Sequence, residues 1–158
     1  MRDNYFSSVN LFSEFVPDLV RRKSGRVLAF GSNAVIYPRG KSAYAAAKAA
    51  LETLVRGIAA EIGGAGVTAN VIRPGMTVTP MSREYFELTR RTGLCDRING
   101  PIGRWLEPDE ITPLVAFLLS DAAGAINGAI LSVDGGDGIP QGIQIHRDRP
   151  GQSVHRDE

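Results

Sequence analysis

The sequence has few of the residues on which disulfide-bonded, metal-binding and membrane-spanning proteins depend. It contains one cysteine, Cys95, which excludes an internal disulfide and suits a reducing cytoplasm. The two histidines, His146 and His155, lie nine residues apart in a polar stretch, which does not indicate a metal site. No apolar run reaches the roughly 20 residues that a transmembrane helix needs. We therefore expect a soluble, cytoplasmic protein with no metal centre and no membrane partner.

The sequence also lacks an excess of either charge. Its 18 basic and 17 acidic residues give a formal net charge of +1, too little for the basic surface that nucleic-acid binding requires. With 158 residues, of which 43% are hydrophobic, the chain can bury one sizeable core. We predict one folded unit over residues 1–136 and a polar, flexible tail over 137–158.

Helical and strand patterns alternate along the folded unit. Apolar residues recur at the helical period in three segments, and three short apolar runs are typical of strands buried on both faces. This order favours an α/β fold, with parallel strands joined by crossover helices. Pro113 lies inside the last helical segment and predicts a local distortion there. In chain order, the helical segments are 5–23, 43–62 and 107–119, and the strands are 26–31, 67–72 and 129–133.

The second helical segment carries a lysine in line with its apolar stripe. Tyr44 and Lys48 are four residues apart, so both lie on the helical face that continues with Leu51 and Val55. An unpaired ammonium is costly to bury on such a face. An ammonium close to a phenol favours the phenolate, which lets a tyrosine exchange a proton near neutral pH. A nearby hydroxyl such as Ser32 would hydrogen-bond a substrate carbonyl, completing a site for carbonyl–alcohol interconversion.

The same pair has a purely structural interpretation, as a surface lysine in the first helical turn beside a half-buried tyrosine. Other stretches of the sequence favour the chemical one. The helix YAAAKAAL (44–51) resembles the Tyr-x-x-x-Lys catalytic helix of short-chain dehydrogenase/reductases, and Ser32, twelve residues before Tyr44, resembles their catalytic serine. The run NVIRPGMTVTPM (70–81) is similar to their Asn-x-x-x-Pro-Gly segment, and residues 103–136 resemble their C-terminal block.

Asn4 belongs to the same resemblance. It lies 21 residues before Gly25, where bacterial 3-oxoacyl-acyl-carrier-protein reductases of the family have a catalytic asparagine. Asparagine is also a preferred helix N-cap, so capping would explain it equally well.

The resemblance implies a Rossmann-like parallel sheet and an NAD(P)-dependent oxidoreductase acting on a small-molecule carbonyl or alcohol. Tyr44 would be the general acid and Ser32 would position the carbonyl oxygen. Lys48 would assist Tyr44 and hold the nicotinamide ribose, while Asn4 would support a water that leads protons to Lys48. The nicotinamide end of NAD or NADP would be held by Tyr44, Lys48, Pro74, Gly75, Thr77 and Thr79.

The sequence departs from the family in one respect. The glycine-rich Thr-Gly-x-x-x-Gly-x-Gly unit and the Asn-Asn-Ala-Gly strand do not occur in it. By the resemblance, the chain corresponds to the C-terminal, catalytic half of the fold, without the strands that bind the rest of the dinucleotide. The strand at 26–31 would then have an open apolar edge. We expect a second copy, in a homodimer or homotetramer, or a missing N-terminal half to cover it.

The sequence is also compatible with two other functions. The chain could be a non-catalytic scaffold that keeps only oligomer-forming helices, or a lyase or dehalogenase that uses Ser32 and Tyr44 without nicotinamide. Lys48 argues against the second case, because its contact with a nicotinamide ribose would have no purpose there. The substrate itself is not readable, but the segment 81–103 would shape its pocket. We predict an apolar lining from Tyr85, Phe86 and Leu88, with Arg90 and Arg91 nearby. Those arginines could contact an anionic carrier or carboxylate, but we expect them to be solvated surface residues.

Overall fold

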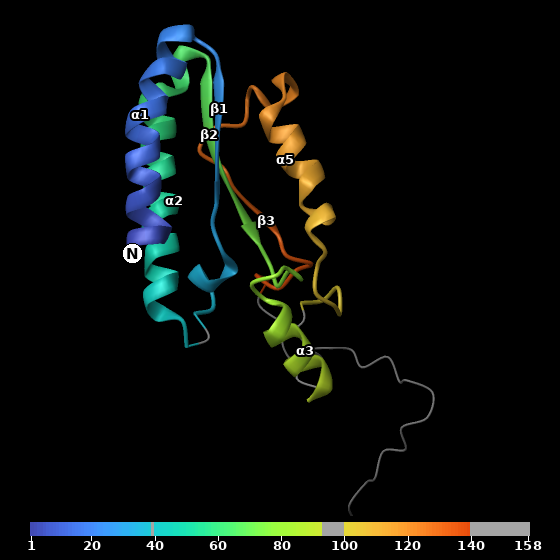
Figure 1. The fold of residues 1–158 in the computed structure, drawn as a ribbon. Helices are drawn as coiled ribbons and strands as arrows, with labels where there is room; N and C mark the ends of the chain where they lie inside the picture. Colours follow the sequence, from blue (N-terminus) through green and yellow to red (C-terminus); the bar gives the residue numbers. More distant parts are fainter. Residues whose placement is uncertain (39, 93–99, 140–158) are drawn as a thin grey trace, which may run out of the picture.

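The computed structural model describes residues 1–38, 40–92 and 100–139 (Figure 1). Cys95, both histidines and residues 140–158 of the predicted tail lie outside this part of the chain. Within it, none of the helices is long and apolar enough to cross a membrane.

The described residues form a three-stranded parallel sheet. Its strands are β1 (Gly25–Phe30), β2 (Val67–Pro74) and β3 (Ile130–Val133), in the order β1-β2-β3. The register pairs Val27 with Ala69 and Ile72 with Leu131. Both pairings are parallel, so the predicted α/β fold with crossover helices is confirmed.

Helices cover both faces of this sheet (Figure 1). Helices α1 (Ser7–Arg22) and α2 (Ser42–Ile62) lie on one face, and α5 (Thr112–Leu119) lies on the other. The short α3 (Arg83–Arg91) lies beyond the carboxyl ends of the strands. Side chains alternate along β2, so that Val71 packs with α2 while its neighbour Ile72 packs with α5. Two apolar cores therefore hold the sheet in place between the helical layers.

Buried Asn70 fixes the approach to β3. Its side chain is 1% exposed, donates to the carbonyl oxygen of Ile126 at 2.7 Å and accepts from the amide of Ala129 at 3.0 Å. Both polar atoms of the amide are thus satisfied, as a buried side chain requires. The asparagine that opens the Asn-x-x-x-Pro-Gly run therefore has a structural role.

The first and the last helical segments differ most from the sequence prediction. The first helix starts earlier, with a π-helical turn over Arg2–Phe6, and neither that turn nor α1 has a side-chain cap. The capping explanation for Asn4 is therefore wrong. The last helical segment is divided into a 3₁₀ turn, Pro108–Glu110, and α5, which begins at Thr112. Pro113 lies in the first turn of α5, where its missing N–H has no partner to lose, so the predicted distortion takes the form of a break.

Candidate active site

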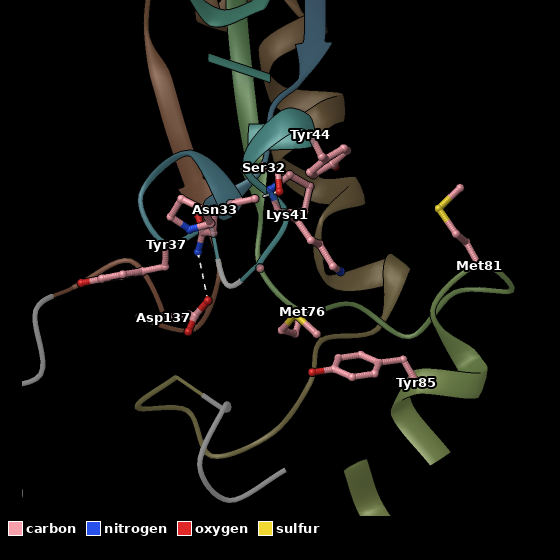
Figure 2. Close-up of a pocket in the computed structure, with 13 residues that line it drawn as sticks. Ser32, Asn33, Tyr37, Lys41, Tyr44, Met76, Met81, Tyr85 and Asp137 are labelled. Atoms are coloured by element: carbon pink, nitrogen blue, oxygen red, sulfur yellow. Dashed lines mark hydrogen bonds between the residues drawn. The ribbon is translucent and has the colours of Figure 1, made fainter. Parts of the chain in front are cut away.

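A pocket of about 430 Å³ opens at the carboxyl ends of the three strands (Figure 2). Ser32 and Asn33 follow β1, Gly75 follows β2 and Asp137 follows β3, and all of them line it. Tyr44, in the first turn of α2, forms part of the wall. The loops that leave parallel strands meet at one edge of the sheet, which is where α/β folds form their sites.

The structure brings the predicted serine and tyrosine into this pocket with their hydroxyl groups available. The Ser32 Oγ accepts a hydrogen bond from the amide of Ala34 at 3.2 Å, and its own O–H donates to no acceptor among the described residues. The Tyr44 side chain is 37% exposed, and its phenol makes no hydrogen bond within the described part of the chain. Both hydroxyl groups line the same pocket and are available to a ligand.

Lys48 lies one helical turn behind Tyr44. Its Nζ is 5.8 Å from the centroid of the Tyr44 ring and donates to the carbonyl oxygen of Phe30 at 2.9 Å. Partial burial lowers the pKa of Lys48, and the nearby Glu52 carboxylate opposes that shift. An ammonium has three donors, so two remain for a ligand such as a ribose hydroxyl.

A buried ion pair behind Lys48 was not predicted from the sequence. The side chains of Glu52 and Arg73 are 5% and 18% exposed. The Arg73 Nε donates to Glu52 Oε1 at 2.6 Å, and its Nη2 donates to Oε2 at 2.5 Å. These hydrogen bonds raise the pKa of Arg73. A Cβ atom on Gly31 would lie 2.7 Å from Glu52 Oε1, so the pair is packed directly under the start of the serine loop.

Substituting Glu52 by glutamine is expected to lower the pKa of Lys48 further. The carboxylate now opposes the shift caused by burial, and its removal also leaves the Arg73 cation uncompensated nearby. NMR titration of the ¹³Cε-labelled Lys48 side chain measures the change. Glu61→Gln, at an exposed position of the same helix, is the matched control and should leave the Lys48 titration in place. An unchanged or raised pKa in Glu52→Gln would contradict this electrostatic account.

Asn4 and Lys48 line a second pocket, of about 250 Å³, beside β1. The first turn of the chain and α1 form one wall of this pocket, while Phe30 and Leu51 contribute to the other. The predicted site is thus divided, with Ser32 and Tyr44 in the main pocket and Asn4 on the far side of Lys48.

The predicted cofactor-binding residues are also divided. Pro74 and Gly75 line the main pocket, and Gly75 is closely packed, because a Cβ there would lie 2.7 Å from the Cα of Asp134. Thr77 and Thr79 do not line it. The Thr77 hydroxyl donates to the Gly75 carbonyl oxygen at 3.0 Å, and that of Thr79 is hydrogen-bonded to Ser82 at 3.0 Å. Both threonines therefore shape the segment that follows β2.

The predicted apolar lining is correct for one of its three residues. Tyr85 lines the pocket, but Phe86 packs on Trp105 with ring centroids 5.1 Å apart, and Leu88 is 47% exposed outside the lining. Helix α3 presents only part of one face toward the pocket, so the others contact Trp105 or solvent. Arg90 pairs with Glu87 on the helix surface, as expected of a solvated arginine.

Asn33 connects two walls of the pocket by hydrogen bonds. The sequence did not predict this role. Its side chain is 6% exposed and its Nδ2 donates to Asp134 at 2.7 Å and to Asp137 at 3.5 Å (Figure 2). Asp134 also accepts from the amides of Gly136 and Gly138 at 2.9 Å. The loop after β1 is thereby fixed to the loop after β3. No local pattern signals this contact, because the partners are about a hundred residues apart.

Fold and site together define an α/β protein with a serine–tyrosine–lysine group at the carboxyl edge of a parallel sheet. The family model described as "Enoyl-(Acyl carrier protein) reductase" matches residues 1–137. The chain belongs to the short-chain dehydrogenase/reductase family.

Similarity to individual proteins supports this assignment. The chain is 35% identical to 2,3-dihydro-2,3-dihydroxybenzoate dehydrogenase of Escherichia coli over 84% of its length. It is also 35% identical to the 3-oxoacyl-acyl-carrier-protein reductase FabG of Pseudomonas aeruginosa over 85% of its length. In both cases it spans 57% of the relative. A provisionally assigned gluconate 5-dehydrogenase of Beutenbergia cavernae, solved with NADP, superposes with a TM-score of 0.74 and 33% identity, over 84% of this chain and 53% of that one.

Proposed function

We propose that this chain carries the catalytic half of an NAD(P)-dependent oxidoreductase that interconverts a small-molecule carbonyl and a secondary alcohol. One observation carries the proposal: two available hydroxyl groups, on Ser32 and Tyr44, line one pocket, and the Lys48 ammonium lies behind the tyrosine ring. The names of the relatives, which include dehydrogenases and reductases, support the same chemistry. The single cysteine in the sequence supports a cytoplasmic location.

In the direction of reduction, side chains of this chain bind and protonate the carbonyl oxygen of the substrate. Ser32 donates a hydrogen bond to that oxygen and holds it against Tyr44. Tyr44 transfers its phenolic proton to the oxygen as the carbon–oxygen double bond becomes a single bond. The Lys48 ammonium stabilises the phenolate that remains, because an opposite charge close by favours the charged form. Asn4, in the adjoining pocket, supports a water that returns a proton toward Lys48.

The residues present fit the nicotinamide end of a cofactor. Lys48 uses one of its three donors on Phe30, and the remaining two suit the hydroxyl groups of a ribose. Pro74 and Gly75 line the same pocket as the two available hydroxyl groups. Bound NADH or NADPH supplies the hydride. The NADP found in the Beutenbergia cavernae structure supports a nicotinamide cofactor here, and either NAD or NADP is compatible with these contacts.

A turnover assay tests this proposal. The chain is mixed with NADH or NADPH and a panel of small ketones and oxo acids, and loss of the reduced-nicotinamide absorbance is followed. We expect catalysed oxidation of one of the two cofactors that depends on the carbonyl compound. Absence of any carbonyl-dependent oxidation, from a folded chain and with both cofactors, would favour the scaffold function instead.

We further propose that the chain works as a homodimer or homotetramer, unless a nucleotide-binding half covers the same surface. Strand β1 is an edge of the described sheet, and Phe30 at its end is 47% exposed. Leu11 and Phe15, one turn apart on α1, are 53% and 57% exposed, and Leu11 lines the same pocket as Phe30. An apolar band of this kind on a domain surface favours association.

Sedimentation equilibrium over about a hundredfold range of concentration tests the assembly. We expect a mass that is a multiple of the 17.0 kDa chain, and we expect Phe15→Glu to lower it because the charge would enter the interface. Glu14→Gln, at the neighbouring exposed position, is the control and should leave the mass unchanged. A folded 17.0 kDa species throughout would overturn the proposed self-association.

A further inference from the structure

The main pocket contains a cation that the mechanism does not use. Lys41 precedes the first residue of α2 and lines the pocket three positions before Tyr44. Among the described residues that line this pocket, Lys41 is the only one with a positive charge. No ion pair joins it to an acidic side chain in the part of the chain that the structure describes.

The position of the ammonium distinguishes Lys41 from an ordinary surface lysine. Its Nζ lies 5.7 Å from the centroid of the Tyr85 ring, on the opposite wall of the pocket. Figure 2 shows the Lys41 side chain running from the side of Ser32 and Tyr44 toward Met76 and Tyr85. The charge is therefore held across the opening of the pocket, where a cation over an aromatic ring is favourable.

The negative groups around this pocket are occupied elsewhere. Asp137 is the acidic residue of the lining and accepts from Asn33 at 3.5 Å, while Asp134 behind it accepts from Asn33 and two backbone amides. Figure 2 draws Asp137 on the Asn33 side and Lys41 on the Tyr85 side. The Lys41 charge is thus left to be balanced by a ligand.

We propose that Lys41 determines specificity by binding an anionic group, such as a carboxylate, on the carbonyl substrate. This inference rests on the proposed function and names its substrate class: a short oxo acid, or the corresponding hydroxy acid. The carbonyl oxygen lies at Ser32 and Tyr44, the anionic group pairs with Lys41, and the carbon chain between them packs on Met76 and Tyr85. A charged ligand gains a charge-assisted hydrogen bond that its neutral analogue cannot form.

A binding experiment on the whole chain tests this without requiring turnover. The probes are acetoacetate and acetoacetamide, which share a ketone and differ in the charge of the terminal group. Their dissociation constants are measured by ligand-observed NMR titration at low salt with the wild type, Lys41→Gln and Lys41→Arg. We expect the wild type to prefer acetoacetate by about fivefold, the upper end for a largely exposed ion pair. Lys41→Gln should remove the preference, Lys41→Arg should keep it, and added salt should weaken it.

Lys23→Gln is the matched control. Lys23 follows α1 just before β1, at the opposite end of that strand from the pocket, so this variant should keep the wild-type preference. A preference that survives in Lys41→Gln would overturn the inference, as would a wild type that binds neither probe at about 20 mM. If that happens while carbonyl-dependent oxidation of the cofactor persists, only the role of Lys41 is refuted. If the preference follows Lys41 but no cofactor is oxidised, the proposed function fails and the anion site stands.

Discussion

Replacing Tyr44 by phenylalanine is expected to lower kcat by a factor of about 10² to 10⁴, the usual contribution of a general acid. The substitution removes the phenolic proton and leaves the ring in place. The Tyr44 side chain is 37% exposed and its hydroxyl makes no hydrogen bond among the described residues, so folding should be unaffected. Steady-state oxidation of NADH or NADPH measures the rate, and circular dichroism verifies the fold.

Tyr5→Phe is the control for that experiment. It makes the same chemical change in the first turn of the chain, outside the lining of both pockets, and should leave turnover at the wild-type level. If Tyr44→Phe retained a near-wild-type rate with every active carbonyl compound, the assignment of Tyr44 as proton donor would be wrong.

Arg73→Met is expected to reduce the free energy of unfolding by about 3 kcal/mol, at the lower end of the range for breaking a buried ion pair. The Glu52 side chain is 5% exposed, so without the guanidinium its carboxylate would remain buried and lose both of its arginine hydrogen bonds. The Arg73 side chain is 18% exposed, which leaves some access for water and argues against a larger loss.

Urea denaturation measures the free energy of unfolding of Arg73→Met and of the double variant, and the difference between them gives the cost of the unpaired Glu52 carboxylate. Glu52→Gln/Arg73→Met has no unpaired charge, so it should be more stable than Arg73→Met alone. A double variant that is less stable than the single would contradict the account. It would show that the Glu52 carboxylate stabilises the fold even without Arg73, for example through its charge interaction with Lys48.

Much of the fold could be predicted because its signals are local. The strands at residues 26–31 and 67–72 are short apolar runs, and they pair in parallel because helical segments separate them. The four-residue spacing of Tyr44 and Lys48 places both on one face of α2 whatever surrounds them. Ser32 was only a candidate hydroxyl on chemical grounds, and the resemblance to a family supported it, because no helical or strand period connects it to Tyr44.

The remaining contacts are tertiary and leave little trace in the sequence. Glu52 is four residues after Lys48, which suggests a surface helix pair, yet its side chain turns inward to Arg73 on β2. Asn33 meets Asp134 across 101 positions of the chain. A lysine just before a helix is common in sequences, and only the opposite wall of the pocket, with Tyr85, distinguishes Lys41 from a surface lysine.

Titration of the 158-residue chain with NADH and NADPH, followed by nicotinamide fluorescence, tests the central claim most directly. The account predicts saturable binding of one cofactor with a dissociation constant of about tens of micromolar, in the range of working enzyme sites. It also predicts clear weakening in Lys48→Met, because that side chain offers two donors to the ribose. No fluorescence change with either cofactor up to about 1 mM would contradict it and leave the chain as a scaffold.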